Sequence, residues 1–291
     1  MGSMGMFARV VEFDTDHLRC LLATDAWQAA SQLFLCNQAH AEIARVMGAS
    51  PEGPAGRFWG VLTAEGPTVC GFFCQSRVAC IAPGSVSEAA SLRKVALGPE
   101  QGFRIVIGPY AVALGFLDSI RDRVAVDLER SQAFLAIEDR RGLGPGIESR
   151  PADARDVEWL VEASITLNEE DLGVPRRSVD RALLARRVRE RASRGTSWIV
   201  DVDGTPACKL EIGSDGPAGA LIEGVFTTAC YRGQGLARRL VAEVAGRLLR
   251  TRRRVGLHVG RDNTAARAAY EAAGLREVDD LLLALVRWPR P

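Results

Sequence analysis

Residues 232–237 read Arg-Gly-Gln-Gly-Leu-Ala and place a cation and two glycines at the start of an expected helix. Apolar residues recur at helical spacing from Leu236 to Leu249, so the helix begins directly after the glycines. Gly233 and Gly235 allow a positive φ or a close approach of the backbone to a ligand. Successive N–H groups can then converge on an anion at the positive end of the helix dipole, and Arg232 adds a charge-assisted donor. The stretch predicts a phosphate cradle.

Two nucleotide-binding motifs do not fit this stretch. A nucleotide P-loop needs a Lys-Ser/Thr pair after its last glycine, and none follows here. Arg238 stands where a dinucleotide fingerprint has its third glycine. That fingerprint also opens the first βαβ unit of its domain, whereas this turn comes late. A helix start with merely flexible glycines is the plain alternative.

The stretch resembles the R-x-x-G-x-G/A signature of the GNAT superfamily of acyl-CoA N-acyltransferases, where it holds the coenzyme A pyrophosphate. Residues 224–231, GVFTTACY, resemble the strand that leads to that loop. Residues 262–275, DNTAARAAYEAAGL, resemble the family's N-x-x-A-x-x-x-Y-x-x-x-G-F element, with Leu275 in place of the usual Phe. The three elements occur in the family's order. The resemblance implies an acetyltransferase domain at residues 146–291 that uses acetyl-CoA.

The resemblance also implies a set of coenzyme-binding residues: Phe226, Thr227, Arg232, Gly233, Gln234, Gly235, Leu236, Ala237, Asn263 and Ala266. Backbone N–H groups around Phe226 and Thr227 would polarise the thioester carbonyl. Asn263, Ala266 and Tyr270 share one helix face. Asn263 serves there as an N-cap, as a contact for the pantetheine amides, or as both. Tyr270 would protonate the departing thiolate; the alternative is an aromatic that only holds the helix to the sheet.

The implied reaction is direct attack of an amine on acetyl-CoA. A base must take the amine's proton, because only about one lysine-like amine in a thousand is free base near neutral pH. Glu223 is the expected base, and Glu211 on the adjacent strand is the second choice. Two-residue alternation predicts that Glu223 faces the same side as Thr227. A strand-edge carboxylate in water is the alternative for Glu223.

The amine acceptor is expected beside residues 167–177, LNEEDLGVPRR. Glu169, Glu170 and Asp171 could attract a cationic amine, or they form a solvated helix end. Either a small molecule or a protein could supply the amine.

The elements that must position these residues repeat along the chain. Residues 58–73 and 197–212 each read as strand, tight turn and strand, with turns at Glu65-Gly66 and Asp203-Gly204. A glycine- and proline-rich break lies near residue 145. We therefore expect an α/β chain of two tandem GNAT-like domains. Each would be a mostly antiparallel mixed sheet flanked by helices, with a last strand at 281–288.

The N-terminal domain, residues 1–145, is expected to be a degenerate copy without a coenzyme A cradle. It offers Gly108-Pro109 where we expect the cradle, and proline has no N–H to donate. The arginine and the paired glycines are missing, so coenzyme A is expected to bind only the C-terminal domain.

Composition limits the classes of partner and cofactor that we expect for this chain. The 37 Lys and Arg residues nearly balance the 36 Asp and Glu residues, so no global field attracts nucleic acid or an anionic membrane. The basic stretches 186–194 and 247–254 lack interleaved aromatics and read as solvated helix faces. The 7 cysteines and 3 histidines show no zinc-ligand spacing, so no metal is expected. Reduced thiols and the lack of an export signal indicate the cytoplasm.

The function expected from the sequence is N-acetylation of a primary amine by acetyl-CoA. The alternative is an acyl-CoA-binding sensor or scaffold without turnover. Loss of acetyl-CoA that rises only when an amine is added would separate the two.

Overall fold

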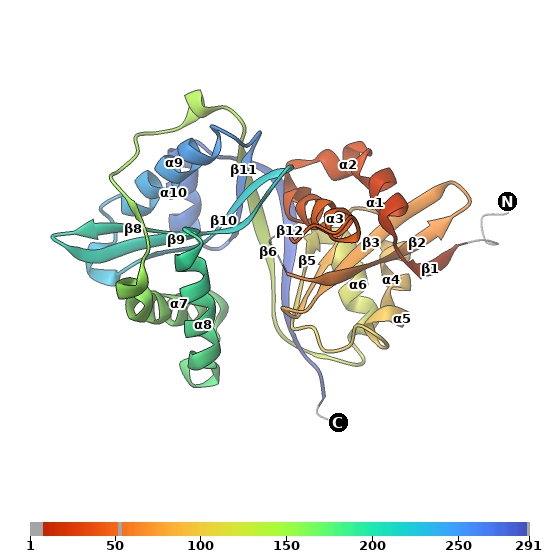
Figure 1. Ribbon diagram of the computed structural model, residues 1–291. Helices are drawn as coiled ribbons and strands as arrows, with labels where there is room; N and C mark the ends of the chain where they lie inside the picture. Colours follow the sequence, from red (N-terminus) through yellow and green to blue (C-terminus); the bar gives the residue numbers. More distant parts are fainter. Residues whose placement is uncertain (1–7, 52–53, 290–291) are drawn as a thin grey trace. The chain divides into compact units, whose positions relative to one another are not determined.

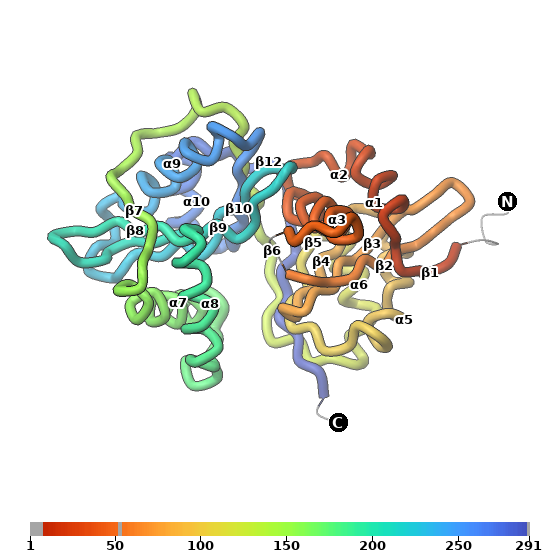
Figure 2. Tube along the Cα trace, viewed as in Figure 1, coloured from red at the N-terminus to blue at the C-terminus, as the bar shows by residue number. Residues whose placement is uncertain are grey.

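The computed structural model describes residues 8–51 and 54–289, and its elements fall into two units (Figure 1). Unit 1 comprises Met1–Phe134, Gly216–Ala218 and Val278–Pro291. Unit 2 comprises Leu135–Asp215 and Gly219–Glu277. Figure 2 traces the same path from the first unit into the second and back.

Unit 1 is a mixed sheet with helices on it. The strands follow the order β1 (Arg9–Glu12), β2 (Gly56–Thr63), β3 (Gly66–Cys74), β4 (Val78–Ile81), β5 (Ile105–Pro109), β12 (Arg276–Arg287) and β6 (Ala125–Ile137). Neighbouring strands from β1 to β4 are antiparallel, whereas β4 and β5 are parallel. The helices are α1 (Thr15–Leu22), α2 (Asp25–Gln28), α3 (Leu33–Val46), α4 (Val86–Ser91), α5 (Arg93–Ala96) and α6 (Tyr110–Ile120).

Strand β12, near the end of the chain, belongs to the sheet of unit 1. It pairs antiparallel with β5, from Leu281 opposite Pro109 to Leu285 opposite Ile105. Leu282, Ala284 and Val286 are buried in the same core as α4 and α6. A single boundary near residue 145 therefore does not separate the two units, because the chain returns to unit 1 at β12. An apolar run predicts a buried strand, but it does not specify which strand will be its neighbour.

Unit 2 has the strand order β6, β11, β10, β9, β8, β7, and only the end of β6, from Leu135, lies in this unit. Besides β6, the strands of this unit are β7 (Arg150–Pro151), β8 (Ser197–Val202), β9 (Thr205–Gly216), β10 (Gly219–Thr227) and β11 (Val255–Gly260). The helices are α7 (Val157–Leu172), α8 (Arg181–Ser193), α9 (Leu236–Leu248) and α10 (Thr264–Ala273). Helices α7 and α8 contact each other, and so do α9 and α10, on the other face of the sheet (Figure 1).

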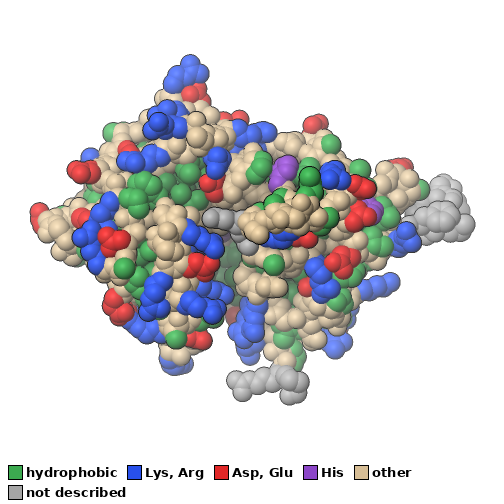
Figure 3. Space-filling model, viewed as in Figure 1, with side chains coloured by type: hydrophobic (Ala, Val, Ile, Leu, Met, Phe, Trp, Pro, Cys, Tyr) green, Lys and Arg blue, Asp and Glu red, His purple; other side chains and the backbone are tan. Residues whose placement is uncertain are grey.

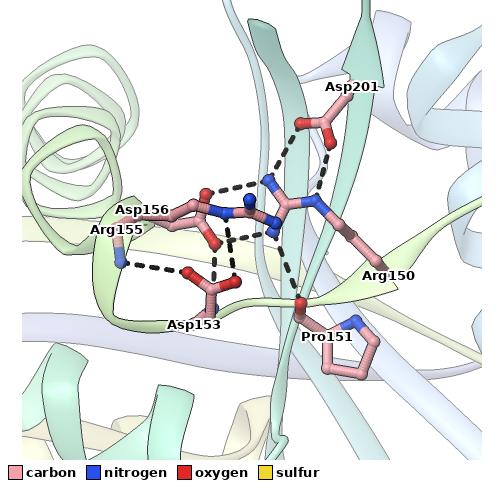
Figure 4. Close-up of polar contacts among 6 residues, drawn as sticks. All are labelled: Arg150, Pro151, Asp153, Arg155, Asp156 and Asp201. Carbon is pink, nitrogen blue, oxygen red and sulfur yellow. Dashed lines mark hydrogen bonds and ion pairs between the residues drawn. The ribbon is translucent and has the colours of Figure 1, made fainter. Parts of the chain in front are cut away.

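The short edge strand β7 is held by one arginine (Figure 4). Arg150 donates two hydrogen bonds to the carboxylate of Asp156, at 2.7 and 2.9 Å, and two to that of Asp201, at 2.6 and 3.1 Å. Asp156 is only 3% exposed and also accepts from the backbone N–H of Asp153. Arg150 thus ties β7 to β8 and to the start of α7.

The predicted fold class is confirmed: each unit is a mixed, mostly antiparallel sheet flanked by helices. The turn between β8 and β9 has positive φ at Asp203 (50°) and Gly204 (76°), as the sequence of this hairpin predicts. Helix α9 begins at Leu236, directly after Gly235, as predicted.

The turn of unit 1 that corresponds to the cradle of unit 2 lies at another position than expected. In unit 2, α9 follows β10, the strand that is parallel to β11. The matching order in unit 1 is β4, parallel to β5, and then α4, so the equivalent turn is Ala82–Ser85. The expectation at Gly108-Pro109 was wrong, because these residues end β5 and precede α6. The N-terminal turn of α4 is closed by its own side chains: Glu88 N–H donates to Ser85 Oγ, and Ser85 N–H donates to the Glu88 carboxylate.

Arginines of the two predicted basic stretches pair with carboxylates of unit 2. Arg194 donates to Glu190 at 2.7 Å, and Arg247 donates to Glu243 at 2.8 Å. On the face shown in Figure 3, acidic and basic side chains are interspersed. Among the described residues, no helix is both long and apolar enough to cross a membrane.

Candidate active site

Strands β10 and β11 pair over only a short length. Ala220 lies opposite Val255 and Leu221 opposite Gly256, whereas β10 continues to Thr227 and β11 to Gly260. The strands therefore part after their first residues. In unit 1, by contrast, β4 and β5 are paired from Val78 to Cys80, nearly the whole of β4.

The predicted cradle lies at the end of β10 and has the expected backbone form. Gly233 and Gly235 have φ of 78° and 75°, values that favour glycine. A Cβ added at Gly233 would meet no heavy atom within 4 Å, so the turn is open. Gly235 is the N-cap of α9 and gives it no side-chain cap, which leaves the first N–H groups of the helix for an anion.

Arg232 is fixed at the rim of the cradle by three neighbours. Its Nε donates to the Thr227 carbonyl at 3.0 Å, and one terminal nitrogen donates to Glu170 at 2.7 Å. Its guanidinium also lies 5.7 Å from the ring centroid of Phe226. Predicted site residues Phe226, Thr227 and Arg232 are thus in contact, and Glu170 of α7 joins them.

Arg238 is a cradle residue that the sequence reasoning missed. From the sequence, Arg238 was noted only as the residue in place of a third glycine, yet its guanidinium lies 3.7 Å from the position of a Cβ on Gly235. Its Nε is buried and has no hydrogen-bond partner among the described residues. Its place in the first turn of α9 was the available signal, because side chains there lean toward the helix N-terminus.

The remaining predicted cradle residues differ in exposure. Gln234 is exposed, with its side-chain nitrogen 3.5 Å from the Cys230 carbonyl. Leu236 is buried under the helix, and Ala237 is partly buried. Leu236 and Ala237 can therefore offer an anion only their backbone N–H groups.

Helix α10 carries the second predicted group. Asn263 is its N-cap: the side-chain oxygen accepts from the Ala266 N–H at 3.1 Å. Tyr270 is 7% exposed, and burial raises the pKa of its hydroxyl, as do the nearby Cys208 and Asp171. The hydroxyl therefore stays protonated at any physiological pH and can only donate its proton to a stronger base.

Cys208 of β9 contacts Thr227 and is close enough to Tyr270 to influence its pKa. The Thr227 hydroxyl donates to the Cys208 sulfur at 3.3 Å. Burial raises the pKa of the Cys208 thiol to about 11, so the sulfur is an uncharged and unreactive neighbour of this site near neutral pH.

The two candidate bases meet in one charged cluster on the opposite face of β9. Arg191 of α8 donates to Glu211 and, at 2.7 Å, to Glu223 Oε1. Lys209 Nζ donates to Glu211 Oε1 at 2.7 Å. Lys209 and Glu211 are buried, whereas the Glu223 side chain is 35% exposed. Glu223 is therefore the carboxylate of this cluster that solvent or a substrate reaches more easily, since the Glu211 side chain is only 10% exposed.

The prediction that Glu223 and Thr227 share a face was wrong. Lys209 and Cys208 are consecutive on β9 and point to opposite faces. Glu223 lies in the cluster with Lys209, whereas Thr227 contacts Cys208. Gly224 supplies the reason: its φ of 61° breaks the regular alternation of β10 between these two residues.

The predicted acidic run on α7 is mostly paired. Glu169 lies 3.8 Å from Arg176, and Glu170 binds Arg232. Asp171 is close enough to Tyr270 to influence its pKa. Within the described residues, no group of three or more metal-ligating side chains is present.

Comparisons with known proteins agree with this geometry. The family model "Acetyltransferase (GNAT) family" matches residues 162–275. No curated protein sequence matches the chain. Among solved structures, a Drosophila protein is similar over 95% of this chain and 98% of its own, with a TM-score of 0.66 and 12% identity. A GCN5-related N-acetyltransferase from Sphaerobacter thermophilus gives a TM-score of 0.57 at 16% identity, over 98% of this chain and 96% of its own.

A further similar structure has two such domains in tandem. It is described as a tandem GNAT protein from the clavulanic acid biosynthesis pathway. It covers 98% of this chain and 99% of its own, with a TM-score of 0.55 and 13% identity. At these identities the similarity establishes the fold.

Proposed function

The chain is a GNAT superfamily protein, and on that premise we propose that unit 2 moves an acetyl group from acetyl-CoA to a primary amine. The observation that supports this most is the parting of β10 and β11 beside an open glycine turn. A long thioester substrate needs a slot for its arm and donors for its phosphates at one end of that slot. The family match over residues 162–275 covers both features.

The phosphates of the coenzyme would bind at the start of α9. The N–H groups that follow Gly233 and Gly235 supply donors, and the helix dipole favours negative charge there. Arg232 and Arg238 add two guanidinium groups, which suit phosphate oxygens. Arg232 must then share its charge with Glu170, to which it is already bound.

The arm of the coenzyme would pass α10 toward Tyr270. The Asn263 oxygen already accepts from Ala266, so its NH₂ group is the part left for the arm's carbonyl groups. Ala266 has a small side chain, so the arm can approach the helix closely at this position. Tyr270 would lie near the sulfur, where its protonated hydroxyl can neutralise the leaving thiolate.

The reaction needs a base and a polarised carbonyl. Glu223 takes a proton from the acceptor ammonium, and the free amine attacks the thioester carbon. Backbone N–H groups around Phe226 and Thr227 stabilise the oxygen as charge develops on it. The C–N bond forms, the C–S bond breaks, the thiolate receives the Tyr270 proton, and the second amine proton restores Tyr270.

Unit 1 would not bind a second coenzyme. Its parallel strands β4 and β5 stay paired, and the Glu88 carboxylate lies at the N-terminus of α4, where a phosphate would have to bind. We therefore propose one acetyl-CoA per chain.

The experiment is a thiol-release assay with acetyl-CoA and a panel of amines: amino acids, polyamines, amino sugars and lysine peptides. Release that depends on one amine class, with a product heavier by one acetyl group in mass spectrometry, supports the proposal. Binding of acetyl-CoA without release for any amine would favour a sensor or scaffold instead.

A further inference from the structure

The charged cluster beneath β10 has a member with no role in the reaction above. Lys209 is 1% exposed, and its Nζ lies 2.7 Å from Glu211 Oε1. Its neighbour across the sheet, Ile199, packs in the core between β8 and the helices α7 and α8. Lys209 therefore points into the protein on the face that carries Glu223, away from Tyr270.

The cluster lies directly under the irregular residue of β10. A Cβ built on Gly224 would stand 3.3 Å from Lys209 Nζ and 3.4 Å from the Glu211 carboxyl carbon. Gly224 combines this close approach with a positive φ, so a larger residue is unfavourable for two reasons. Lys209 and Glu211 thus support the part of β10 between Glu223 and the proposed carbonyl-binding N–H groups.

We propose that Lys209, acting through Glu211 and Arg191, is a positioning residue that sets the charge around Glu223 and so the pH range in which Glu223 accepts the amine's proton. This inference rests on the proposed acetyl transfer and on Glu223 as its base.

The charges of the cluster give the direction of the effect. Arg191 is cationic, and Glu211 and Glu223 are anionic, so the cluster carries one net negative charge when Lys209 is neutral. A proton on Glu223 then makes the cluster neutral. When Lys209 is charged, the same proton would leave a net positive charge in a largely buried site, which is unfavourable. Glu223 therefore accepts a proton more readily when Lys209 is neutral.

Lys209 can change its charge near neutral pH. Burial lowers its pKa to about 7, Arg191 acts in the same direction, and Glu223 and Cys208 act against them. These groups come from α8, β9 and β10, the elements packed around the ammonium. Turnover should accordingly rise as the pH increases through about 7.

The test uses two substitutions with opposite expected effects. Lys209→Met is neutral at every pH, so its kcat should not show the rise near pH 7. Expressed as a fraction of kcat at pH 8, its kcat at pH 6 should exceed that of the parent protein by about tenfold. Lys209→Arg is charged at every pH and should lower kcat by at least about tenfold at pH 8, with little change in acetyl-CoA affinity. Lys94→Met is the control, because Lys94 is the only other lysine and is exposed in unit 1.

A second measurement needs no altered cluster and no turnover. Protein labelled with ¹³Cε-lysine should give two signals, and Lys94→Met identifies the Lys209 signal. We expect that signal to titrate near pH 7. A Lys209 signal that stays charged up to pH 10 would overturn the inference, as would parent-like pH profiles in both variants. Absence of amine-dependent turnover in the parent protein would instead count against the proposed function.

Discussion

Arg232 donates to the Glu170 carboxylate at 2.7 Å, so the cation at the rim of the cradle is bound to the last turn of α7 before any phosphate arrives. Both side chains are nearly half exposed, 46% and 47%. A coenzyme phosphate must therefore compete with Glu170 for the same guanidinium.

Replacing Glu170 should strengthen coenzyme binding. Glu170→Gln removes the competing charge, and an exposed ion pair of this kind is worth up to about 1 kcal/mol, so the Kd for coenzyme A should fall by about two- to fivefold. Titration calorimetry at low salt measures it. Glu169→Gln is the matched control, since Glu169 contacts Arg176 instead. Weaker binding in Glu170→Gln would mean that Glu170 orients Arg232 for the phosphate.

Gly235→Asp should abolish coenzyme binding, because its carboxylate would stand beside the phosphate position at the N-terminus of α9. Positive φ at Gly235 strains most other residues, so charge and strain must be separated. Gly235→Asn provides that control: Asn has the same shape, tolerates this φ and carries no charge. Calorimetry should give one site in the parent, weakened binding in the Asn variant and none in the Asp variant. Two equivalent sites in the parent would show that unit 1 also binds.

Tyr270→Phe should slow the reaction and leave the fold intact. The ring stays buried while the hydroxyl is lost, and general acid catalysis is typically worth about 10²–10⁴-fold in kcat. Coenzyme affinity and melting temperature should change little. Steady-state kinetics with the amine found in the screen and a melting curve measure these quantities. If kcat stays within about threefold of the parent, another group protonates the sulfur.

The Arg150–Asp156 pair should make stability depend on acid pH. Arg150 lowers the pKa of Asp156 below its ordinary value of 3.8, with burial acting against it. Because folding lowers this pKa, the stabilisation is complete above about pH 4 and is lost as the pH falls through the folded value. Arg150→Ala strands a buried carboxylate and should cost about 3 kcal/mol at pH 7.

Urea unfolding between pH 2 and 7 measures this effect. Arg141→Ala is the control, because the Arg141 and Asp139 side chains are 91% and 56% exposed and their pairing should contribute almost nothing. A loss of stability in Arg150→Ala no larger than in that control would show that Arg150 does not anchor β7.

The cradle could be predicted from sequence because its determinants are local. The spacing of Gly233 and Gly235 and the apolar period that starts at Leu236 lie within a few residues of one another. The faces on which Glu223 and Thr227 lie could not be predicted from sequence, because Gly224 adds an irregularity to β10 that period-two alternation does not contain. Lys209 was missed for a related reason: its surroundings include Arg191, which α8 brings to the cluster from another part of the chain. The place of β12 depends on β5, a partner that no local pattern identifies.

The position of β12 has a consequence for biosynthesis. A ribosome releases β5 with the rest of unit 1 long before Leu281–Leu285 have been made. During that interval one side of β5 presents unpaired N–H and C=O groups, the kind of edge that invites association with other chains. Unit 1 can close its sheet only after β12 has been made. Most of unit 1 precedes unit 2 along the chain but is completed after it, so a ribosome that stalls within unit 2 leaves a product with an open sheet edge.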